Sequence, residues 1–581
     1  MNRRARQTFG REGTHQGLVT REIHMLKETF AFAAVAGLAG TVAGQVDPGA
    51  FWPGYKNGND RQASATVASG PAVNLEWTAT TDQPASVGGL AIGSDGMIYF
   101  KTRTGDGTLP KVYKMDPATG NILATSPDLP GDGGAYAGVS LGVNYVWTAV
   151  STAASGTRVS QIIKLNYSDL SIAGVITNPA FDTPGDSAGL RGEPLIGSVP
   201  NQRGNVNLYV HMRGDGSGST PSGLIHCVDS VTGDLDWSYD PLMGNTTFFG
   251  RIGPGWVHDG KMHIGYFGNQ AVAAGVCVRD NADGTYTEVW FGGPDNFNWL
   301  GTGALNDAQD TIYVTTFNDG DTPSMWSIDA LTGAQNWSVP GRRGTIHELN
   351  FFGRPAVIGD RVYACGGFGV ITCFEPDGSG GYVQPWELRP EAVPDPNNPD
   401  LFFDVPWHRD AWATEEDFFN AGEITAYTAV QTDEGETYIY AVMQQQNQDP
   451  DLGTDPLTAQ FIVVRDDGNS ATEVYRTNLG ETMLPTRWGA GSPTPDPAGN
   501  VYVVGGNPSV TGSDPGEIYK FSVSTPCRAD TTGDGMLDFF DVLTFLGWFD
   551  SGDLRADFVD DGILDFFDVL TFLGEFDAGC P

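Results

Sequence analysis

Between about residues 70 and 525 the chain alternates short apolar runs with turns rich in Asp, Gly and Asn. The runs carry aromatic and β-branched residues, which is typical of strands rather than helices. One unit recurs eight times at intervals of about 45 to 75 residues: a polar turn followed by a strand that contains an aromatic residue or His. The eight copies lie at residues 94–99, 143–147, 204–209, 258–263, 308–313, 358–363, 434–438 and 498–502. The pattern therefore predicts an all-β domain built from repeated strand units.

A second signature, the turn Asp-x-x-Thr-Gly, follows the next strand in some of these units. The three complete copies are residues 116–120, 229–233 and 329–333. Asp and Thr side chains can cap a tight turn, and Gly takes the positive φ that such a turn needs. In the last two copies a Trp follows four residues after the Gly, at Trp237 and Trp337. We expect each Trp to lie on the next strand and to pack between neighbouring units.

Repeats of this length with about four strands each are typical of a β-propeller, in which every repeat forms one blade. Eight copies of the unit predict about eight blades, and seven is the alternative if one weak unit is an insertion. Residues 517–521 read as the third strand of the last repeat, and residues 72–77 resemble its missing fourth strand. We therefore expect the N-terminal strand to complete the last blade and close the ring, which removes exposed strand edges.

The motif Asp-x-x-Thr-Gly-x-x-x-Trp resembles the repeat of pyrroloquinoline-quinone-type propellers over about 450 residues. That family includes quinoprotein dehydrogenases and a non-enzymatic lipoprotein of outer-membrane assembly. Resemblance to the enzymes implies adjacent cysteines over the cofactor, an active-site calcium and an Asp base, but the sequence has no Cys-Cys pair. Motifs of zinc proteases, serine hydrolases and phosphate-binding loops are also missing from the sequence. Binding or display is thus favoured over catalysis, with a quinoprotein-like oxidoreductase or a polysaccharide-active propeller as the alternative.

Histidines and one long loop are the other candidates for chemistry in the propeller. His258 and His263 occur where other repeats have ordinary turn and strand residues, so a structural role is expected. His347 and His408 lie in or near longer connections, where a solvated loop is favoured and a place at a mouth of the ring is the alternative. Residues 386–422 form an insertion rich in aromatics and carboxylates, a composition that suits a glycan or peptide ligand. A packed loop without a ligand is the equal alternative.

The strongest local pattern lies near the C-terminus, at residues 530–541. Side-chain oxygens occur at positions one, three, five, nine and twelve of this twelve-residue segment, and Gly535 occupies position six, where the loop must turn sharply. This is the EF-hand pattern for calcium (Ca2+), with Asp in place of the usual Glu at position twelve. The expected ligands are Asp530, Thr532, Asp534, Met536 through its main-chain carbonyl, Asp538 and Asp541.

A second copy of the loop begins 27 residues later, at residues 557–568. Val559 occupies its third position and has no side-chain oxygen, and the neighbouring Asp560 is left open as a substitute. We therefore expect the second loop to bind calcium more weakly. Its expected ligands are Asp557, Asp561, Ile563 through its main-chain carbonyl, Asp565 and Asp568.

Each loop is followed by the same sequence, because residues 537–547 recur identically as residues 564–574. Both copies read as a short amphipathic helix that ends at Gly. Cys527 and Cys580 enclose the two copies and are expected to pair, since an exported chain with an even number of cysteines favours disulfides.

The duplicated loop-helix unit resembles a type I dockerin, and the enclosing cysteines resemble its cysteine-bracketed variant at the C-termini of large secreted bacterial proteins. The resemblance implies attachment to a cohesin-like or other surface protein. In cellulosomal dockerins, positions ten and eleven of each loop are small and hydroxylated and help to choose the cohesin. Both positions are Phe in each copy here, so the four Phe are expected to form either the core of the module or an apolar docking surface. They are Phe539, Phe540, Phe566 and Phe567.

The charge balance is strongly acidic, with 71 Asp and Glu against 32 Lys and Arg. Such a surface repels nucleic acid and anionic lipid and suits divalent cations. Solubility or a saline habitat explains the same charge equally well. Beyond residue 44 no segment approaches about 18 uninterrupted apolar residues, so we expect no membrane span.

The N-terminal part of the chain predicts export. The apolar run at residues 30–43 reads as a secretory signal peptide with a cut after Ala43 or Gly44, and Met25 is an alternative start. The predicted organisation is an extension and signal peptide at 1–44, a propeller at 45–525 and a dockerin-type module at 527–581. We expect a secreted protein, outside the cell or at its surface, and leave a periplasmic location open.

The four other cysteines have less defined expectations. Cys365 and Cys373 flank a Gly-Gly-Phe-Gly turn and could face each other across a hairpin. For Cys227 and Cys277 the sequence leaves both a disulfide and two buried thiols open.

Overall fold

The chain divides into a unit of residues 1–43 and a unit of residues 44–581. The first unit, with the predicted signal peptide, lies outside the described residues. The computed structural model describes residues 46–579 except 55–56, 58–62, 84, 86–88, 103–108, 132–137, 155–156, 185–188, 191, 214–223, 241–250, 253–255, 259–260, 268–274, 293–302, 307, 309, 317–323, 341–354, 366–370, 389–422, 445–458, 480–491, 507–515, 524–527, 533–536 and 560. In this described part, no helix is both long enough and apolar enough to cross a membrane.

The described strands form eight sheets of four or five strands each, called here the first to the eighth in chain order. The first is β3 (Ala91–Ile92), β4 (Ile98–Lys101), β5 (Val112–Met115) and β6 (Ile122–Thr125). The second is β7 (Ser140–Leu141), β8 (Tyr145–Ala154), β9 (Thr157–Asn166), β10 (Ile172–Thr177) and β11 (Thr183–Pro184), with the 3-10 turn η1 (Pro179–Phe181). The third is β12 (Gly189–Leu190), β13 (Leu195–Pro200), β14 (Val206–Arg213), β15 (Ile225–Asp229) and β16 (Leu235–Tyr239). The fourth is β17 (Arg251–Ile252), β18 (Trp256–His258), β19 (Lys261–Phe267), β20 (Gly275–Asp280) and β21 (Tyr286–Gly292).

The remaining sheets include two strands from the N-terminal part of the chain. The fifth is β22 (Ala304–Leu305), β23 (Thr311–Thr316), β24 (Ser324–Asp329) and β25 (Gln335–Pro340). The sixth is β26 (Ala356–Ile358), β27 (Arg361–Cys365), β28 (Ile371–Pro376) and β29 (Tyr382–Leu388). The seventh is β30 (Glu423–Thr432), β31 (Thr437–Gln444), β32 (Ala459–Asp466) and β33 (Ala471–Asn478), joined by β1 (Ser64–Val67). The eighth is β34 (Thr494–Pro495), β35 (Val501–Gly506) and β36 (Gly516–Val523), joined by β2 (Ala72–Thr81).

Each of the eight turn-and-strand segments predicted from the sequence contributes to a different sheet. They supply strands β4, β8, β14, β19, β23, β27, β31 and β35. Tyr99, Trp147 and Tyr363 from these segments are 0% exposed, because each strand has neighbouring strands on both sides and a packed face. The predicted repeat is thus confirmed at the level of the strand.

The Asp-x-x-Thr-Gly turns join the third and fourth strands of a sheet and also contact the preceding sheet. Asp329 caps its turn by accepting a 2.9 Å hydrogen bond from the main-chain N–H of Leu331. Gly333 adopts φ +72°, and a Cβ there would lie 2.6 Å from the ring of Trp290 in the fourth sheet. Trp290 Nε1 donates to the carbonyl of Ala330 at 3.0 Å. The glycine is therefore needed both for the turn and for close packing between sheets.

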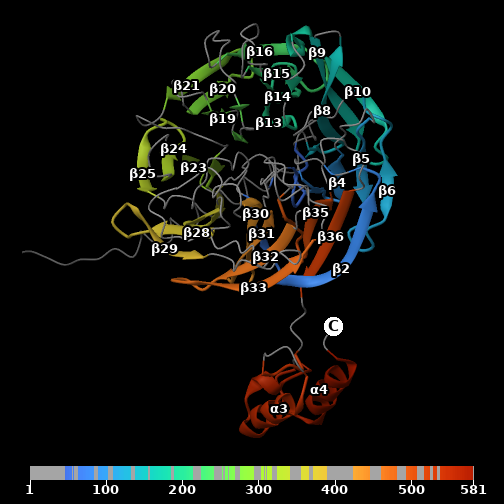
Figure 1. Cartoon of the computed structure of the whole chain (residues 1–581), viewed down its shortest axis with the longest axis vertical. Coiled ribbons are helices and arrows are strands. Elements are labelled where there is room, and N and C mark those ends of the chain that lie inside the picture. The colour runs from blue at the N-terminus through green and yellow to red at the C-terminus, as the bar shows by residue number, and fades with distance from the viewer. Residues whose placement is uncertain are drawn as a thin grey trace, which may run out of the picture. The chain divides into compact units, whose positions relative to one another are not determined.

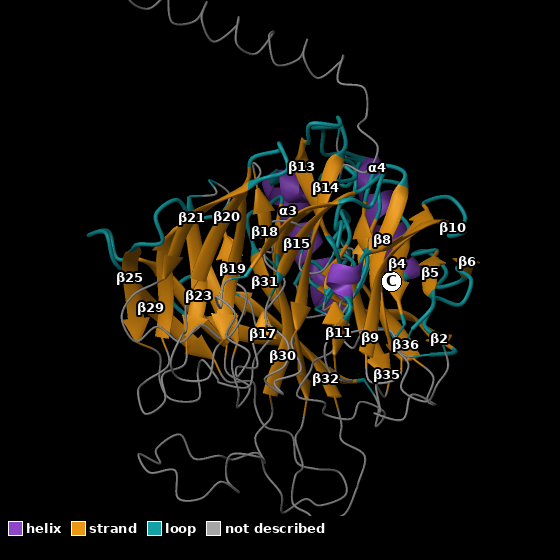
Figure 2. Ribbon diagram, turned by 90° about the horizontal axis from the view of Figure 1, so that it is seen from above, coloured by secondary structure: helices purple, strands orange, loops and turns teal. Residues whose placement is uncertain are grey.

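Apolar clusters lie between neighbouring sheets. Among the described residues, seven such clusters join every neighbouring pair except the second and third sheets. Between that pair, the ring of Phe181 lies 5.6 Å from His226, and Gly233 contacts Ile176. The packing runs from sheet to sheet in a closed cycle, and Figure 1 shows the sheets around a common centre. This is the architecture of a β-propeller, as predicted. Strands make up the ring, and the described α-helices belong to the C-terminal module (Figure 2).

The cycle is closed by β2, as the sequence predicted. β2 pairs antiparallel with β36, from Ala72 opposite Val523 to Thr81 opposite Gly516. The eighth sheet therefore takes its outermost strand from the N-terminal side and three strands from the C-terminal side.

Residues 46–68, named here the N-terminal strap, lie within the predicted propeller at 45–525, but their pairing with its sheets was not predicted. Trp52 exchanges main-chain hydrogen bonds with Ile92 on the free edge of β3, opposite to the edge that pairs with β4. Val46 bridges to Gly142 beside the second sheet, and β1 pairs in parallel with β30 of the seventh. Ala68 donates to the carbonyl of Pro497 beside the eighth. The strap thus contacts four consecutive sheets, the seventh, eighth, first and second.

The expectation that Cys365 and Cys373 face each other is wrong. In the hairpin of β27 and β28, Cys365 lies opposite Ile371 and Cys373 lies opposite Tyr363. Diagonal neighbours of this kind are about 7–8 Å apart, too far for a disulfide. These two cysteines, with Cys227 and Cys277, are buried and not in disulfides. Of the two readings left open for the latter pair, two buried thiols is correct.

Candidate functional site

The C-terminal module, described here from residue 528 to 579, has an apolar core of its own. Helices α3 (Phe539–Ser551) and α4 (Phe566–Ala578) are linked through the 3-10 turn η2 (Leu554–Ala556). Phe545 and Phe572, equivalent residues of the two copies, stack with ring centroids 4.0 Å apart. Phe558 stands edge-on to both rings. The sequence duplication thus produces a single core in which equivalent side chains meet.

Both helices begin with the same capping box. Asp538 accepts a 2.7 Å hydrogen bond from the N–H of Phe540, and Asp541 accepts one of 2.9 Å from the N–H of Asp538. Asp565 and Asp568 form the corresponding bonds in α4, at 2.7 and 2.8 Å. A capping box satisfies main-chain N–H groups that have no partner in the first helical turn. Positions nine and twelve of the predicted calcium loops therefore also start the helices.

The carboxylates at position twelve also hold the beginning of each loop. Asp541 and Asp568 are both 0% exposed. Asp541 Oδ1 accepts hydrogen bonds from the N–H and the hydroxyl of Thr532, at 2.9 and 3.0 Å. Asp568 Oδ1 accepts one of 3.0 Å from the N–H of Val559. In both copies one buried carboxylate links loop position three to the start of the helix.

These contacts keep the two carboxyl groups ionised. Burial alone opposes ionisation, but the hydrogen bonds from main-chain N–H groups outweigh it, so the pKa values of Asp541 and Asp568 lie below their ordinary value. A carboxyl group must be deprotonated to bind a metal ion, and both groups meet that condition at neutral pH.

The structure brings together part of the ligand set predicted for the first loop. Thr532 Oγ1 lies 3.3 Å from Asp530 Oδ1 and also contacts Asp541. Asp538, at position nine, lies against Asp541 through the capping box. Asp534 and Met536 lie outside the described residues. Four of the six predicted ligand positions are therefore described. Thr532 and Asp538 both contact Asp541, and Thr532 also contacts Asp530.

In the second loop, the carboxylate of Asp557 is engaged by the loop itself. It accepts hydrogen bonds from the N–H groups of Asp561 at 3.2 Å and Gly562 at 2.7 Å. Asp561 in turn accepts a 2.9 Å bond from the N–H of Ile563. Val559 at position three is exposed and offers no side-chain oxygen. Each oxygen of Asp557 accepts only one of these bonds and keeps a free lone pair, so the carboxylate can still ligate a cation.

Within the described residues, no group of three or more His, Cys, Asp or Glu side chains is placed to hold a metal ion. The chemistry of the predicted set still fits a hard cation, because its side-chain ligands are all oxygens and mostly carboxylates. The two buried carboxylates at position twelve already face their loops. The first loop fits calcium better than the second, since Thr532 supplies the oxygen that Val559 lacks.

The four Phe at loop positions ten and eleven are exposed, so the hypothesis that they form the core is wrong. Phe539 and Phe540 are 67% and 64% exposed, and Phe566 and Phe567 are 67% and 63% exposed. The core is filled instead from the other face of each helix, by residues such as Phe545 and Phe572. Of the two readings, an apolar docking surface remains.

Carboxylates in the propeller join neighbouring sheets. Asp280 of the fourth sheet accepts hydrogen bonds from Tyr209 at 2.8 Å and from Trp237 Nε1 at 3.3 Å, both in the third sheet. Trp237 therefore packs between units as predicted. The acceptor was not predicted from the sequence, although an Asp ends the third strand of several repeats.

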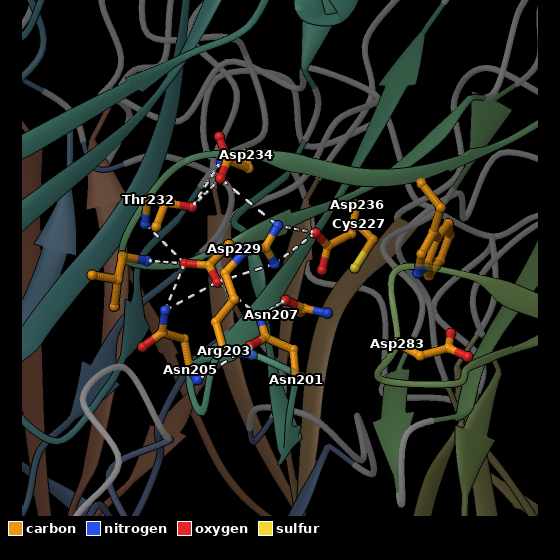
Figure 3. Close-up of polar contacts among 12 residues, drawn as sticks. Asn201, Arg203, Asn205, Asn207, Cys227, Asp229, Thr232, Asp234, Asp236 and Asp283 are labelled. Atoms are coloured by element: carbon orange, nitrogen blue, oxygen red, sulfur yellow. Dashed lines mark hydrogen bonds and ion pairs between the residues drawn. The ribbon is translucent and has the colours of Figure 1, made fainter.

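A denser polar cluster lies at one end of the third sheet (Figure 3). Asp229 is 0% exposed and accepts hydrogen bonds from Asn201 and Asn205, and Arg203 forms an ion pair of 2.7 Å with Asp236. Burial opposes ionisation of Asp229, but its hydrogen-bond donors hold its pKa below the ordinary value. The cluster links two adjacent turns of one sheet by hydrogen bonds and ion pairs, which indicates a structural role.

A lysine of the first sheet, Lys101, is fully buried. Lys101 is 0% exposed, and its Nζ donates to the carbonyl of Ala149 at 2.8 Å. Burial lowers the pKa of Lys101 to about 7, against the effect of the Glu193 carboxylate, which is itself buried. This contact could not be predicted from the sequence, because the three residues come from different repeats.

Most other candidates in the propeller lie outside the described residues. These are residues 389–422 of the insertion, His347 and His408. His258 and His263 occupy β18 and β19, which agrees with the expected position in a turn and its strands. The bracketing Cys527 and Cys580 also lie outside the described residues.

No protein-family model matches the chain. No curated protein sequence matches it either. Among solved structures, the chain is similar to the quinohemoprotein alcohol dehydrogenase from Comamonas testosteroni, with a TM-score of 0.50 and 12% identity over 82% of this chain and 81% of that one. BamB from Moraxella catarrhalis has a TM-score of 0.31 and 13% identity over 66% of this chain and 96% of that one. At these identities the first likeness shows the fold alone, and it supports a propeller of the pyrroloquinoline-quinone type.

Proposed function

We propose that this protein is an exported, eight-bladed β-propeller that is attached to a partner by a calcium-dependent C-terminal module of the dockerin kind. The observation that carries the proposal is the duplicated loop-helix unit, whose buried Asp541 and Asp568 make equivalent contacts and whose Phe pairs are exposed. Eight sheets packed in a cycle support one blade per sheet. The propeller would bind or display a ligand, such as a glycan or a peptide, at the place where the module holds it.

Calcium would be held by the oxygens of the two loops. In the first, the ligands are Asp530, Thr532, Asp534, the carbonyl of Met536, Asp538 and Asp541. In the second, they are Asp557, Asp561, the carbonyl of Ile563, Asp565 and Asp568. A bound ion would supply positive charge that offsets the mutual repulsion of these carboxylates. Asp541 and Asp568 would transmit that stabilisation to the helices, because each already connects its loop to a helix start.

Calorimetric titration of the full chain with calcium tests the proposal. We expect one stronger and one weaker binding event, and loss of the stronger one in Asp534→Ala. The matched control is Asp561→Ala at position five of the second loop, which should remove only the weaker event. Retention of both events in Asp534→Ala would overturn the ligand assignment.

A propeller enzyme tethered by the same module is the second candidate. Two observations favour it: the fold shared with a quinohemoprotein alcohol dehydrogenase, and the buried Lys101, whose amine is unusually easy to deprotonate. The missing Cys-Cys pair stands against it. The test is to add pyrroloquinoline quinone and calcium and to record absorbance and alcohol-dependent dye reduction. A cofactor spectrum with dye reduction would establish the enzyme and displace the binding role.

A further inference from the structure

The exposed apolar side chains of the module form a repeated set. In α3 they are Phe539, Phe540, Leu543 and Leu546, and α4 exposes the equivalent residues 27 positions later. The exposed fractions of all eight lie between 46% and 67%. We call these eight residues the apolar face. Eight large apolar residues exposed on so small a module are typical of an interaction surface.

A glycine continues the apolar face in each helix. Gly547 and Gly574 are exposed in helix interiors, and a Cβ at either would meet nothing within 4 Å. Glycine in such a position destabilises a helix by roughly 0.5–1 kcal/mol relative to alanine. The fold of the module does not require a glycine at either position. Both glycines are therefore suited to let another molecule approach the helix backbone closely.

The surroundings of the apolar face are acidic. Residues 527–581 contain 13 Asp and Glu and only two Arg, so two calcium ions would not neutralise the module. Both Arg side chains are engaged within it: Arg555 pairs with Asp553 at 2.6 Å, and Arg528 donates to the carbonyl of Asp557 at 2.8 Å. Exposed Asp550 and Asp577 follow Leu546 and Leu573 by four residues, which places them on the same side of each helix.

We propose that the apolar face binds a protein partner whose contact surface is apolar, fits closely over the glycines and is fringed by Lys and Arg. The inference rests on the proposed docking function and defines the chemistry of its partner. Phe at positions ten and eleven excludes recognition by hydroxyl pairing at those positions. A second copy of this chain would bring two strongly acidic modules together, and an anionic membrane would repel the module for the same reason.

Two synthetic helical peptides serve as probes, with the same Leu and Ala face and either Lys or Glu along its flanks. Binding to the full chain in calcium is measured by fluorescence anisotropy. We expect the Lys peptide to bind about tenfold tighter than the Glu peptide or more, and to weaken between about 0.05 and 0.5 M NaCl. Equal binding of the two peptides, or tighter binding of the Glu peptide, would overturn the proposal.

Substitutions distinguish an effect on binding by the apolar face from an effect on the stability of the module. A variant with Ser at all four Phe positions should bind the Lys peptide about tenfold more weakly or worse. The four positions are Phe539, Phe540, Phe566 and Phe567. Leu554→Ser is the matched control, since Leu554 is 63% exposed but lies outside the apolar face, and it should leave binding unchanged. Replacing Gly547 and Gly574 by Ala should raise the melting temperature of the module and yet weaken binding. Unchanged binding in that double variant would contradict the close fit.

Further measurements identify the other occupants. If sedimentation shows a calcium-dependent dimer that the four-Phe variant abolishes, the apolar face binds a second copy of this chain and not a basic partner. If the chain floats with phosphatidylcholine vesicles, the apolar face binds a membrane instead. The peptide titration is repeated in chelator, so that peptide binding by the apolar face is measured separately from calcium binding. Calcium binding without binding of either peptide would refute this inference alone, whereas a chain that binds no calcium would refute the proposed function.

Discussion

At the scale of single residues, the carboxylates at position twelve have a role that does not depend on a metal. Asp541 is buried and accepts hydrogen bonds from the loop and from the helix start. In chelator, Asp541→Ala should therefore lower the free energy of unfolding of the module by about 2 kcal/mol or more, because it leaves buried N–H groups without an acceptor. Chemical denaturation followed by circular dichroism measures the change. Asp550→Ala, at an exposed position of the same helix, is the control and should change it little.

The same residue predicts a response to acid. The pKa of Asp541 is lower in the folded state than in the unfolded chain, where an Asp titrates near about 3.9. Its contribution to stability is therefore complete above that value and is lost as the pH falls through the lower, folded pKa. Denaturation midpoints measured between about pH 6 and pH 2 should fall less steeply in Asp541→Asn than in the native protein. Parallel pH profiles would show that the carboxylate is not stabilised by its contacts.

A buried carboxylate between the sixth and seventh sheets predicts a larger effect. Asp466 accepts hydrogen bonds from Tyr363 at 2.7 Å and Trp386 Nε1 at 3.0 Å, and it pairs with Arg361. Asp466→Ala should cost about 3–5 kcal/mol, since it leaves a partly buried cation and two buried donors without their partner. The neighbouring Asp467 has a surface pair with Arg465, so Asp467→Ala should cost under about 1 kcal/mol. Equal unfolding midpoints would refute the role of Asp466 as a link between sheets.

At the scale of elements, the strands and helices that recur in the sequence were predicted. Pairings between segments far apart in the chain were harder to predict. The recurring turn and aromatic strand predicted one strand in every sheet, and the duplicated loop-helix predicted both terminal helices. The pairing of the N-terminal strap was not predicted, because residues 46–68 do not repeat elsewhere in the chain and β1 pairs with β30, far along the chain. The sequence left open whether Phe539 and Phe566 are buried or exposed, since two Phe-bearing faces of one short helix compete for the core, and the structure decides for exposure.

The strap is expected to stabilise the whole ring. Trp52 is 1% exposed and packs in the cluster between the eighth and first sheets. Trp52→Ala should lower the stability of the propeller by about 3–5 kcal/mol, because the cavity would open between two sheets. Leu123→Ala on β6, at a side chain 55% exposed, should stay within about 0.5 kcal/mol. Tryptophan fluorescence during urea unfolding distinguishes the two, and comparable losses would assign no special role to the strap.

At the scale of the whole molecule, separate cores predict separate unfolding. The core of the module consists of residues 529–576 only, and the clusters of the ring include none of them. Calorimetry should therefore show two transitions, of which chelator lowers only the one that belongs to the module. At calcium concentrations 100 times the Kd, the stabilisation should be about 2.7 kcal/mol for one site. A chelator-sensitive transition of the ring would instead reveal calcium bound within the propeller.

The pairing of β2 with β36 also determines when folding can be completed during synthesis of the chain. Ser522 and Asn74, which contact each other across this pair, are 448 residues apart in the chain. A ribosome adding roughly 5–20 residues per second needs about 20–90 seconds to cover that distance. During this interval β2 is without its partner strand, and an unpaired strand of this kind invites aggregation and proteolysis. Folding of the ring thus ends with the pairing of one of its earliest strands, so factors that bind nascent or translocating chains should act chiefly on the N-terminal 80 or so residues.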